Sequence, residues 1–244
     1  MKLEGKTALI TGGAVRVGRV LCEALAAAGV RVVIHYHQSA PAARELAQML
    51  RARGAEAWIL RANLDSEAAC RRTIRRAAEL GGGLDILVNN AAVFHKAEFR
   101  ALTLGGLRAE FMINLFAPML LMAEFAKVAR TGNIINILDR RIAGLDTACV
   151  PYLLSKKALA GATALAAYAF APRIRVNAVA PGSVLVAPAG DRRRTREKAG
   201  EIPLQRRATP ADVADAVLFL IRNDALTGQV VYVDGGQHLV KAAD

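Results

Sequence analysis

Short apolar runs rich in β-branched residues alternate with longer segments of helical periodicity along almost the whole chain. The expected strands cover residues 6–10, 30–35, 55–60, 84–89, 133–138, 173–179 and 229–233. The expected helices cover residues 16–28, 41–53, 66–80, 103–129, 152–170 and 210–222. Strands that alternate with helices form βαβ units and a parallel sheet. Because such crossovers are right-handed, the pattern predicts a doubly wound, Rossmann-type α/β fold with strand order 3-2-1-4-5-6-7.

The alternation contains no repeat and no linker, so residues 1–244 are expected to form a single nucleotide-binding domain. One long segment, residues 181–209, has no regular periodicity. Irregular segments of that length in a compact domain are usually functional. We therefore expect residues 183–207 to form the substrate loop.

The expected helix 152–170 is apolar on nearly every face after its first turn. A helix that is hydrophobic all round is buried on all sides. One face of a helix in a doubly wound domain normally meets water, so this face is expected to pack on another subunit. A long loop folded over the helix is the alternative.

The composition fits a globular protein, with 54% hydrophobic and 22% charged residues. No uninterrupted apolar run reaches the roughly 18 residues of a membrane span, and the N-terminal segment has no signal-peptide layout. Cys22, Cys70 and Cys149 lack the spacing of a disulfide framework or of a metal site. We expect buried thiols, no metal, no membrane partner and a cytoplasmic location.

The formal net charge of +12 permits two interpretations. Nucleic-acid binding is one, but no helix-turn-helix, zinc-finger or RNP-like pattern is present, so no nucleic-acid partner is expected. A basic surface that attracts an anionic cofactor or substrate is the other. The dense basic run at 192–198 either attracts an anionic tail such as a folate glutamate or is simply solvated.

The sequence TGGAVRVG stands between the first expected strand and the first expected helix. Gly12 and Gly13 permit a tight turn, and Gly18 permits close helix–strand packing. The N-terminus of the helix offers free N–H groups and the positive end of its dipole to a pyrophosphate. This context predicts a dinucleotide site.

The end of the second strand indicates which dinucleotide is bound. An NAD site places an acidic residue there to bind the ribose 2′-hydroxyl, but residues 24–44 contain no acid. The segment His35-Tyr36-His37-Gln38-Ser39 tolerates a 2′-phosphate, to which Ser39, His37 and Arg16 can donate. The expected cofactor is therefore NADP(H).

Tyr152 and Lys156 are four residues apart on one expected helix, so they share a face. A tyrosine with a pKa of ~10 is a poor acid–base group near neutral pH. A nearby ammonium is expected to stabilise the phenolate and to bring the pKa of Tyr152 toward the working range. Asn114 on the preceding helix can hold a water on a proton path to Lys156.

Several motifs occur in a fixed order: TGxxxxxG at 11–18, NNA at 89–91, Asn114, Tyr-x-x-x-Lys at 152–156, PG at 181–182 and VDGG at 233–236. The set resembles the short-chain dehydrogenase/reductase family over essentially the full chain. The resemblance implies an NAD(P)-dependent oxidoreductase that forms a homotetramer or homodimer. It also implies that Tyr152 donates the proton, Lys156 binds the nicotinamide ribose and Asn114 joins the proton relay. Asn63 stands where the family usually has Asp against the adenine.

The same resemblance implies a cofactor site drawn from the turn, the ends of the strands and the segment after strand six. Its expected members are Gly12, Arg16, Val17, Gly18, His35, Tyr36, His37, Gln38, Ser39, Asn63, Leu64, Asn90, Ala91, Lys156, Pro181, Gly182 and Ser183.

Two residues depart from the general family pattern. Arg16 replaces the middle glycine of the turn, and Asp139 replaces the serine thirteen residues before the tyrosine. That serine donates a hydrogen bond to the alkoxide that develops in carbonyl reduction, whereas an ionised Asp139 would repel it. Either Asp139 is protonated, or the substrate presents nitrogen donors and an imine, as a pterin does. Alone, Asp139 could equally be an ion-pair partner of Arg140 or Arg141.

Both departures are similar to those of the pteridine reductases, as are the HYHQS segment and NNAxxF with Phe94. That resemblance implies that Phe94 stacks on the pterin, that Arg16 contacts phosphate and substrate, and that Asp139 and Tyr152 form the acid pair. Phe94 taken alone reads more readily as a core aromatic. The match is incomplete, since Val15, Gln38 and Ala92 replace the subgroup's Lys, Arg and Ser, and the stretch after Gly182 is shorter.

The expected function is NADPH-dependent reduction of a pterin or of dihydrofolate. A carbonyl reductase acting on a 3-oxoacyl thioester, a sugar or a steroid is the alternative enzyme, with Asp139 as a tolerated substitution. A non-catalytic NADPH sensor is the alternative from another class. The complete set of Asn114, Tyr152 and Lys156 argues against a sensor, which has no use for a proton relay.

Overall fold

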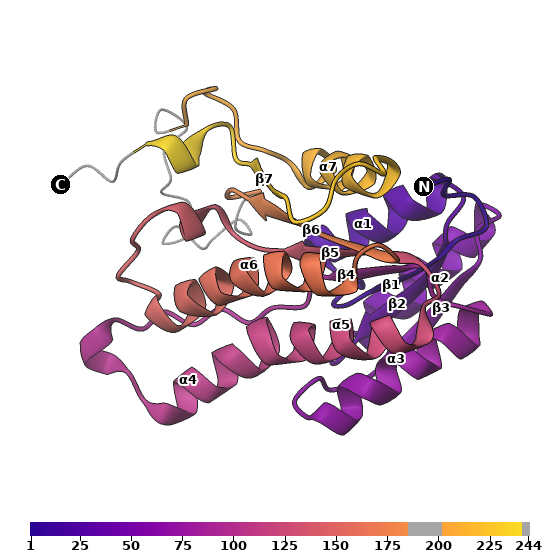
Figure 1. Ribbon diagram of the computed structural model, residues 1–244, viewed down its shortest axis with the longest axis horizontal. Coiled ribbons are helices and arrows are strands. Elements are labelled where there is room, and N and C mark those ends of the chain that lie inside the picture. Colours follow the sequence, from indigo (N-terminus) through magenta and orange to yellow (C-terminus); the bar gives the residue numbers. More distant parts are fainter. Residues whose placement is uncertain (185–201, 241–244) are drawn as a thin grey trace.

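In the computed structural model, residues 1–184 and 202–240 are described. They contain a seven-stranded parallel sheet in the order β3-β2-β1-β4-β5-β6-β7 (Figure 1), as the alternation predicts. The strands are β1 (Thr7–Ile10), β2 (Arg31–Tyr36), β3 (Ala57–Arg61), β4 (Ile86–Asn89), β5 (Gly132–Ile137), β6 (Ile174–Pro181) and β7 (Val230–Val233). The arginine-rich run 192–198 and most of the expected substrate loop lie outside the described residues.

Helices cover both faces of the sheet (Figure 1). The α-helices are α1 (Arg16–Ala27), α2 (Ala40–Ala52), α3 (Glu67–Gly81), α4 (Leu104–Phe111), α5 (Ala117–Val128), α6 (Val150–Phe170) and α7 (Pro210–Arg222). One core packs α1, α2 and α7 on the sheet, and the other packs α3, α5 and α6 on the opposite face. The central strands are apolar and fully buried because helices cover both of their sides.

Most helix ends lie within two residues of their expected positions. The Ser66 side chain caps α3 by accepting a hydrogen bond from the Ala69 N–H at 3.4 Å, as its place before the helix predicts. Helix α6 begins at Val150 because Pro151 fits the first turn of a helix, where its missing N–H costs nothing.

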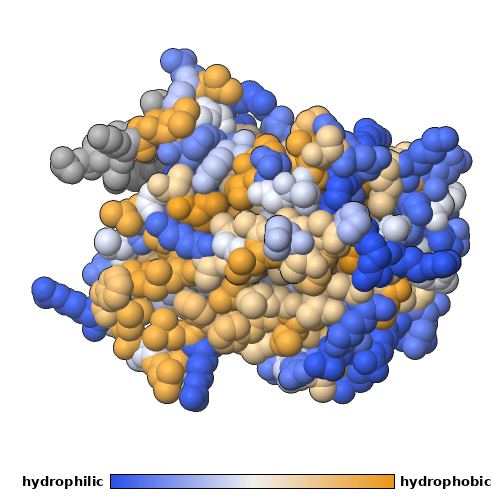
Figure 2. Space-filling view, in the orientation of Figure 1, coloured by the Kyte–Doolittle hydropathy of each residue, from blue (hydrophilic) through white to orange (hydrophobic). Residues whose placement is uncertain are grey.

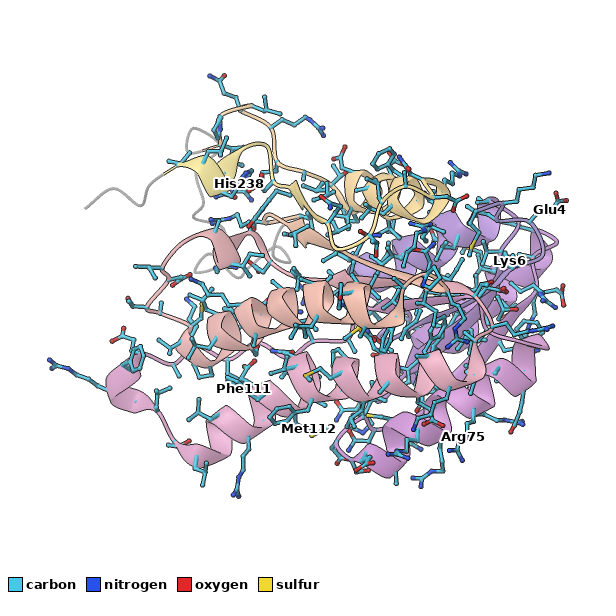
Figure 3. The ribbon with its side chains drawn as sticks, in the orientation of Figure 1. Glu4, Lys6, Arg75, Phe111, Met112 and His238 are labelled. Atoms are coloured by element: carbon cyan, nitrogen blue, oxygen red, sulfur yellow. The ribbon has the colours of Figure 1, made fainter. Side chains whose placement is uncertain are left out.

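The expected continuous helix 103–129 is wrong in one respect. A π-helical turn, Met112–Phe116, separates α4 from α5; Phe111 and Met112, labelled in Figure 3, stand at the junction. Pro118 explains the interruption, because it cannot donate the backbone hydrogen bond that the Asn114 carbonyl would accept in an α-helix. Single π turns of this kind occur often at functional sites.

The helical stretch Leu104–Val128 is long and apolar enough for a membrane span, by length and composition alone. Its mean hydropathy is 1.5 over the most apolar window, of which 44% is buried. Leu121 and Phe125 belong to the core beneath the sheet, so packing in the core accounts for the apolar character of this stretch.

The outer face of α6 is apolar and exposed. Leu154, Leu165 and Tyr168 are 42%, 74% and 91% exposed, and Phe116 and Met119 lie exposed on the neighbouring π turn and α5. Figure 2 shows hydrophobic residues gathered over α6 and the adjoining helices. None of the described residues folds over this face as the loop alternative requires.

Candidate active site

A cavity of about 730 Å³ opens where the carboxyl ends of the strands meet. The strand order reverses between β1 and β4, and such a switch point is where open α/β sheets bind ligands. Most of the expected site residues line the cavity. Tyr36, Gln38, Ser39 and Asn114 do not.

The β1–α1 turn provides a close-fitting cradle. Gly12 has a φ of 61°, and a Cβ on Gly18 would collide with the Gly12 carbonyl oxygen. The Asn90 side-chain amide donates to the carbonyl oxygens of Thr11 and Gly12 at 2.9 and 3.2 Å. These contacts join the turn to the end of β4 and leave room for a phosphate against the backbone.

Arg16 begins α1 with a φ of 55°, a conformation that glycine adopts without strain. The left-handed conformation costs a residue with a Cβ about 1–2 kcal/mol. Strain of this kind collects at functional sites, and Arg16 lines the cavity. Arginine in place of the family's glycine therefore destabilises the fold. The substitution is useful only if the guanidinium binds a ligand in the cavity.

His35 is buried, with 2% of its surface exposed. Its Nδ1 accepts the Gly12 N–H at 3.1 Å, and its Nε2 lies 3.2 Å from the Ala62 carbonyl oxygen. Nδ1 is therefore unprotonated and Nε2 donates, so the imidazole is neutral. Burial lowers the pKa of His35 to about 4. The geometry makes His35 a link between the phosphate turn and the segment after β3. Both His35 and His37 line the cavity.

Tyr36, by contrast, packs in the core under α2 at 8% exposure. Asn63 lines the far end of the cavity, and its Nδ2 donates to Asp65 Oδ2 at 2.6 Å. This contact leaves the Asn63 Oδ1 available as an acceptor for an adenine amino group. Asp65 also lines the cavity, and its place two residues after Asn63 is a signal that the sequence interpretation missed.

Tyr152, Lys156 and Asp139 meet in the inner part of the cavity. The Tyr152 hydroxyl donates to Asp139 Oδ2 at 3.1 Å. The Lys156 Nζ donates to the Ile137 carbonyl oxygen at 2.7 Å, which fixes the ammonium at the end of β5. Phe94 packs edge-to-face on the Tyr152 ring, with centroids 4.8 Å apart. Phe94 thus belongs to the wall of the cavity, where a flat ring can contact it.

The expected lowering of the tyrosine pKa is wrong for this protein. Burial and the adjacent Asp139 raise the pKa of Tyr152 well above its ordinary value. Burial also lowers the pKa of Lys156 to about 8. For Tyr152, burial is the larger cause, and Asp139, which stands where the family has a serine, adds to it by disfavouring the phenolate. Tyr152 therefore remains a protonated donor across the neutral range.

Asp139 both forms an ion pair with Arg141 and contacts Tyr152, the two alternatives that the sequence left open. Arg141 Nη1 lies 3.3 and 3.0 Å from its two oxygens, and the Arg141 backbone N–H donates to Oδ1 at 2.9 Å. Asp139 also accepts from Tyr152. Asp139 therefore joins the Arg141 guanidinium to the Tyr152 hydroxyl in one hydrogen-bonded group.

Asn114 lies in the π turn, and its side chain holds the loop that carries Phe94. It accepts the Val93 N–H and donates to the Val93 carbonyl, both at 2.9 Å, and it donates to Glu110 Oε2 at 2.7 Å. The side chain of Asn114 is thus committed to this loop. A water on the path to Lys156 would have to use the Asn114 carbonyl, which Pro118 cannot bind.

The sequence interpretation missed Glu110, a carboxylate with 1% exposure beneath the cavity. Its Oε1 accepts from the backbone N–H and the Nδ1 of His95 at 2.6 and 2.9 Å. Its place four residues before Asn114, on the same face of a helix, was the available signal. For Arg141, the sequence suggested only that it is one of two possible ion-pair partners of Asp139.

The fold and the cavity at the switch point define a class, the Rossmann-type oxidoreductases. A family model described as Enoyl-(Acyl carrier protein) reductase matches residues 13–238. The putative ketoacyl reductase 2 of the granaticin polyketide synthase from Streptomyces violaceoruber is 35% identical, with 97% of this chain and 98% of that protein covered. The chain belongs to the short-chain dehydrogenase/reductase family, whose members depend on NAD(P).

Two further relatives indicate different substrates. The 3-oxoacyl-(acyl-carrier-protein) reductase FabG of Aquifex aeolicus is 32% identical, with 97% of this chain and 98% of that protein covered. The structure of FolM Alternative dihydrofolate reductase 1 from Brucella canis, complexed with NADP, superposes with a TM-score of 0.93 at 32% identity. The superposition covers 99% of this chain and 97% of the Brucella canis chain. Sequence neighbours thus include ketoacyl reductases, and structural neighbours include a dihydrofolate reductase.

Proposed function

We propose that this protein reduces a C=N bond of a pterin or of dihydrofolate with NADPH. One observation carries the proposal: a carboxylate, Asp139, faces the cavity within hydrogen-bond distance of the proton donor Tyr152. A pterin presents ring N–H and amino donors to such a group, while the alkoxide of a reduced ketone would be repelled. Phe94 on the same wall offers a surface for a flat heterocycle.

NADPH supplies the hydride when it is bound. Tyr152 gives its proton to the ring nitrogen next to the carbon that receives the hydride, so that C=N becomes CH–NH. Asp139 accepts hydrogen bonds from the substrate and orients the ring. The Lys156 ammonium holds the nicotinamide ribose and returns a proton to Tyr152. Asn114 keeps the Phe94 loop in place through Val93.

The residues present fit an NADP cofactor. The cradle at Gly12 and Gly18 admits a pyrophosphate where a Cβ would collide. Arg16 and His37 line the cavity at the ribose end, and Asp and Glu are absent from residues 24–44. These groups favour a 2′-phosphate over a 2′-hydroxyl. The NADP bound to the Brucella canis relative supports the same preference.

Reduction of a 3-oxoacyl thioester is the second candidate, and the ketoacyl reductases among the relatives favour it. Asp139 separates the two candidates, because a developing alkoxide gains stabilisation from a hydroxyl and loses it to a carboxylate.

The test is spectrophotometry of NADPH oxidation with dihydrobiopterin, dihydrofolate and an acetoacetyl thioester, each compared with NADH. Asp139→Ser is expected to reduce kcat/KM for the pterin by roughly 10- to 100-fold and to leave or improve turnover of the thioester. Turnover of the thioester alone by the wild type would overturn the proposal. Tight NADPH binding without any turnover would favour the sensor.

We also propose that the chain forms a homo-oligomer through the exposed apolar face of α6, α5 and the π turn. Large exposed apolar patches on a folded chain mark interaction sites. A second copy is the simplest occupant, because two-fold symmetry pairs such a face with itself.

A further inference from the structure

Arg141 contacts the features that set this cavity apart. It lies in the 3-10 turn η3 (Arg140–Ala143), with 26% of its side chain exposed. Besides its bonds to Asp139, its Nε donates to Asp146 Oδ2 at 2.9 Å. Its guanidinium carbon lies 5.8 Å from the centre of the Phe94 ring. One side chain therefore touches both the carboxylate and the aromatic ring of the cavity wall.

Arg141 stands behind these groups. Asp139 and Phe94 line the cavity, whereas Arg141 is outside the set of described residues that do so. The contact of Arg141 that reaches the cavity wall is therefore the one to Asp139. Asp146 holds its Nε, so the guanidinium has a fixed orientation toward Asp139.

The charge of Arg141 determines what Asp139 can do. An ionised carboxylate only accepts hydrogen bonds, whereas a protonated one also donates. Arg141 Nη1 donates to both oxygens of Asp139, which fixes the carboxylate in one orientation toward the cavity. An acceptor-only group pairs with N–H donors and repels a developing oxyanion.

Other titratable groups surround this pair. They are Arg140 in the same turn, Asp146 after it, Cys149, Tyr152 and Lys156 at α6, and His238 in the 3-10 turn η5 (Gln237–Leu239), which contacts η3; His238 is labelled in Figure 3. His238 binds Asp234 through Nδ1, and Lys156 donates to Ile137. Arg141 supplies a direct cationic contact to the carboxylate.

We infer that Arg141 is a positioning residue for substrate choice: it holds Asp139 as an oriented carboxylate, so that the cavity takes an aminated heterocycle in preference to a ketone. The inference rests on the proposed function and deepens it by naming the residue that determines the hydrogen-bonding character of Asp139.

The test is titration of the purified chain, saturated with NADP, with a 2-amino-4-oxopteridine and with its 2-deaminated analogue. The readout is the dissociation constant from calorimetry between pH 5 and pH 8. Arg141→Met is expected to weaken binding of the aminated ring by roughly 10- to 100-fold and to abolish most of the discrimination between the two ligands.

Three further variants make the result specific. Arg141→Lys keeps the charge but loses the planar guanidinium, so an intermediate effect is expected. Asp146→Asn releases only the Nε contact, so a smaller change in the same direction is expected. Arg72→Met removes one exposed charge from α3 and is expected to change nothing. Thermal unfolding of each variant shows whether it is folded. If Arg141→Met does not fold, Arg141→Lys and Asp146→Asn still test the inference.

The outcomes separate the two proposals. A wild type that binds neither pteridine overturns the proposed function and this inference with it. A wild type that discriminates between the two pteridines, with a folded Arg141→Met that discriminates equally, overturns the inference alone. Equal weakening of both ligands by Arg141→Met shows a merely structural role and also overturns the inference.

Discussion

At the scale of single residues, one substitution accounts for most of what is unusual in the site. Asp139 stands where the family has serine, and together with burial, the larger cause, it raises the pKa of Tyr152 well above the ordinary value. A tyrosine that stays protonated suits the direction of reduction, in which it must give a proton away. Lys156, whose pKa burial lowers to about 8, remains charged in the neutral range.

Tyr152→Phe tests the proton donor. The hydroxyl is the group that donates to Asp139 in the cavity, and phenylalanine keeps the ring against Phe94. We expect kcat to fall by roughly 10²- to 10⁴-fold, with the dissociation constant of NADPH nearly unchanged. Steady-state kinetics and fluorescence titration measure the two quantities, and a near-normal kcat would refute the role.

Arg16→Gly tests the strain at the start of α1. Glycine adopts a φ of 55° without strain, so the free energy of unfolding is expected to rise by about 1 kcal/mol. The lost guanidinium is expected to raise the KM for NADPH at the same time. Denaturant unfolding and kinetics give the two values. A variant that is less stable and equally active would contradict the functional explanation of Arg16.

At the scale of elements, the site is assembled by bonds between strand ends and loops. His35 in β2 joins the Gly12 turn to Ala62 after β3. The π turn between α4 and α5 places Asn114 against Val93 and so holds the Phe94 loop. Each contact joins segments that are distant in the sequence, so a change in one element is transmitted to the cavity.

His35→Gln tests the first of these links. The pKa of His35 is about 4 in the folded chain and 6.5 without burial, so below pH 6.5 the unfolded chain binds a proton that the folded chain excludes. The free energy of unfolding is therefore expected to fall by about 3 kcal/mol from pH 6.5 to pH 4 on account of this group. The variant should lack that part of the slope. Parallel slopes for both proteins in urea unfolding would contradict the burial argument.

At the scale of the whole molecule, the apolar outer surface of α6 is the feature that the isolated chain does not explain. Tyr168 and Leu165 are 91% and 74% exposed on a helix whose inner face lies in the core. The bulk of the described charged surface lies elsewhere, as Figure 2 shows in blue. An isologous contact between copies would bury this face.

Leu165→Asp combined with Tyr168→Asp tests the oligomer. Two charges in a buried apolar contact are each unfavourable by several kcal/mol, so the variant is expected to run as a monomer. Light scattering coupled to gel filtration measures the mass. Gln48→Asp, on the exposed side of α2, is the matched control and should keep the wild-type mass. A monomeric wild type would remove the oligomer proposal.

The sequence alone determined the strand order, because alternating apolar periods and right-handed crossovers leave few topologies. Motif spacing likewise identified the turn at Gly12 and the Tyr152–Lys156 pair, since both depend on local geometry. Only the tertiary structure decided the burial of His35, the π turn at Asn114 and the direction of the Tyr152 pKa. These depend on neighbours from other elements, above all the Asp139–Arg141 pair beside α6, whose distances and shared burial no spacing along the chain reveals.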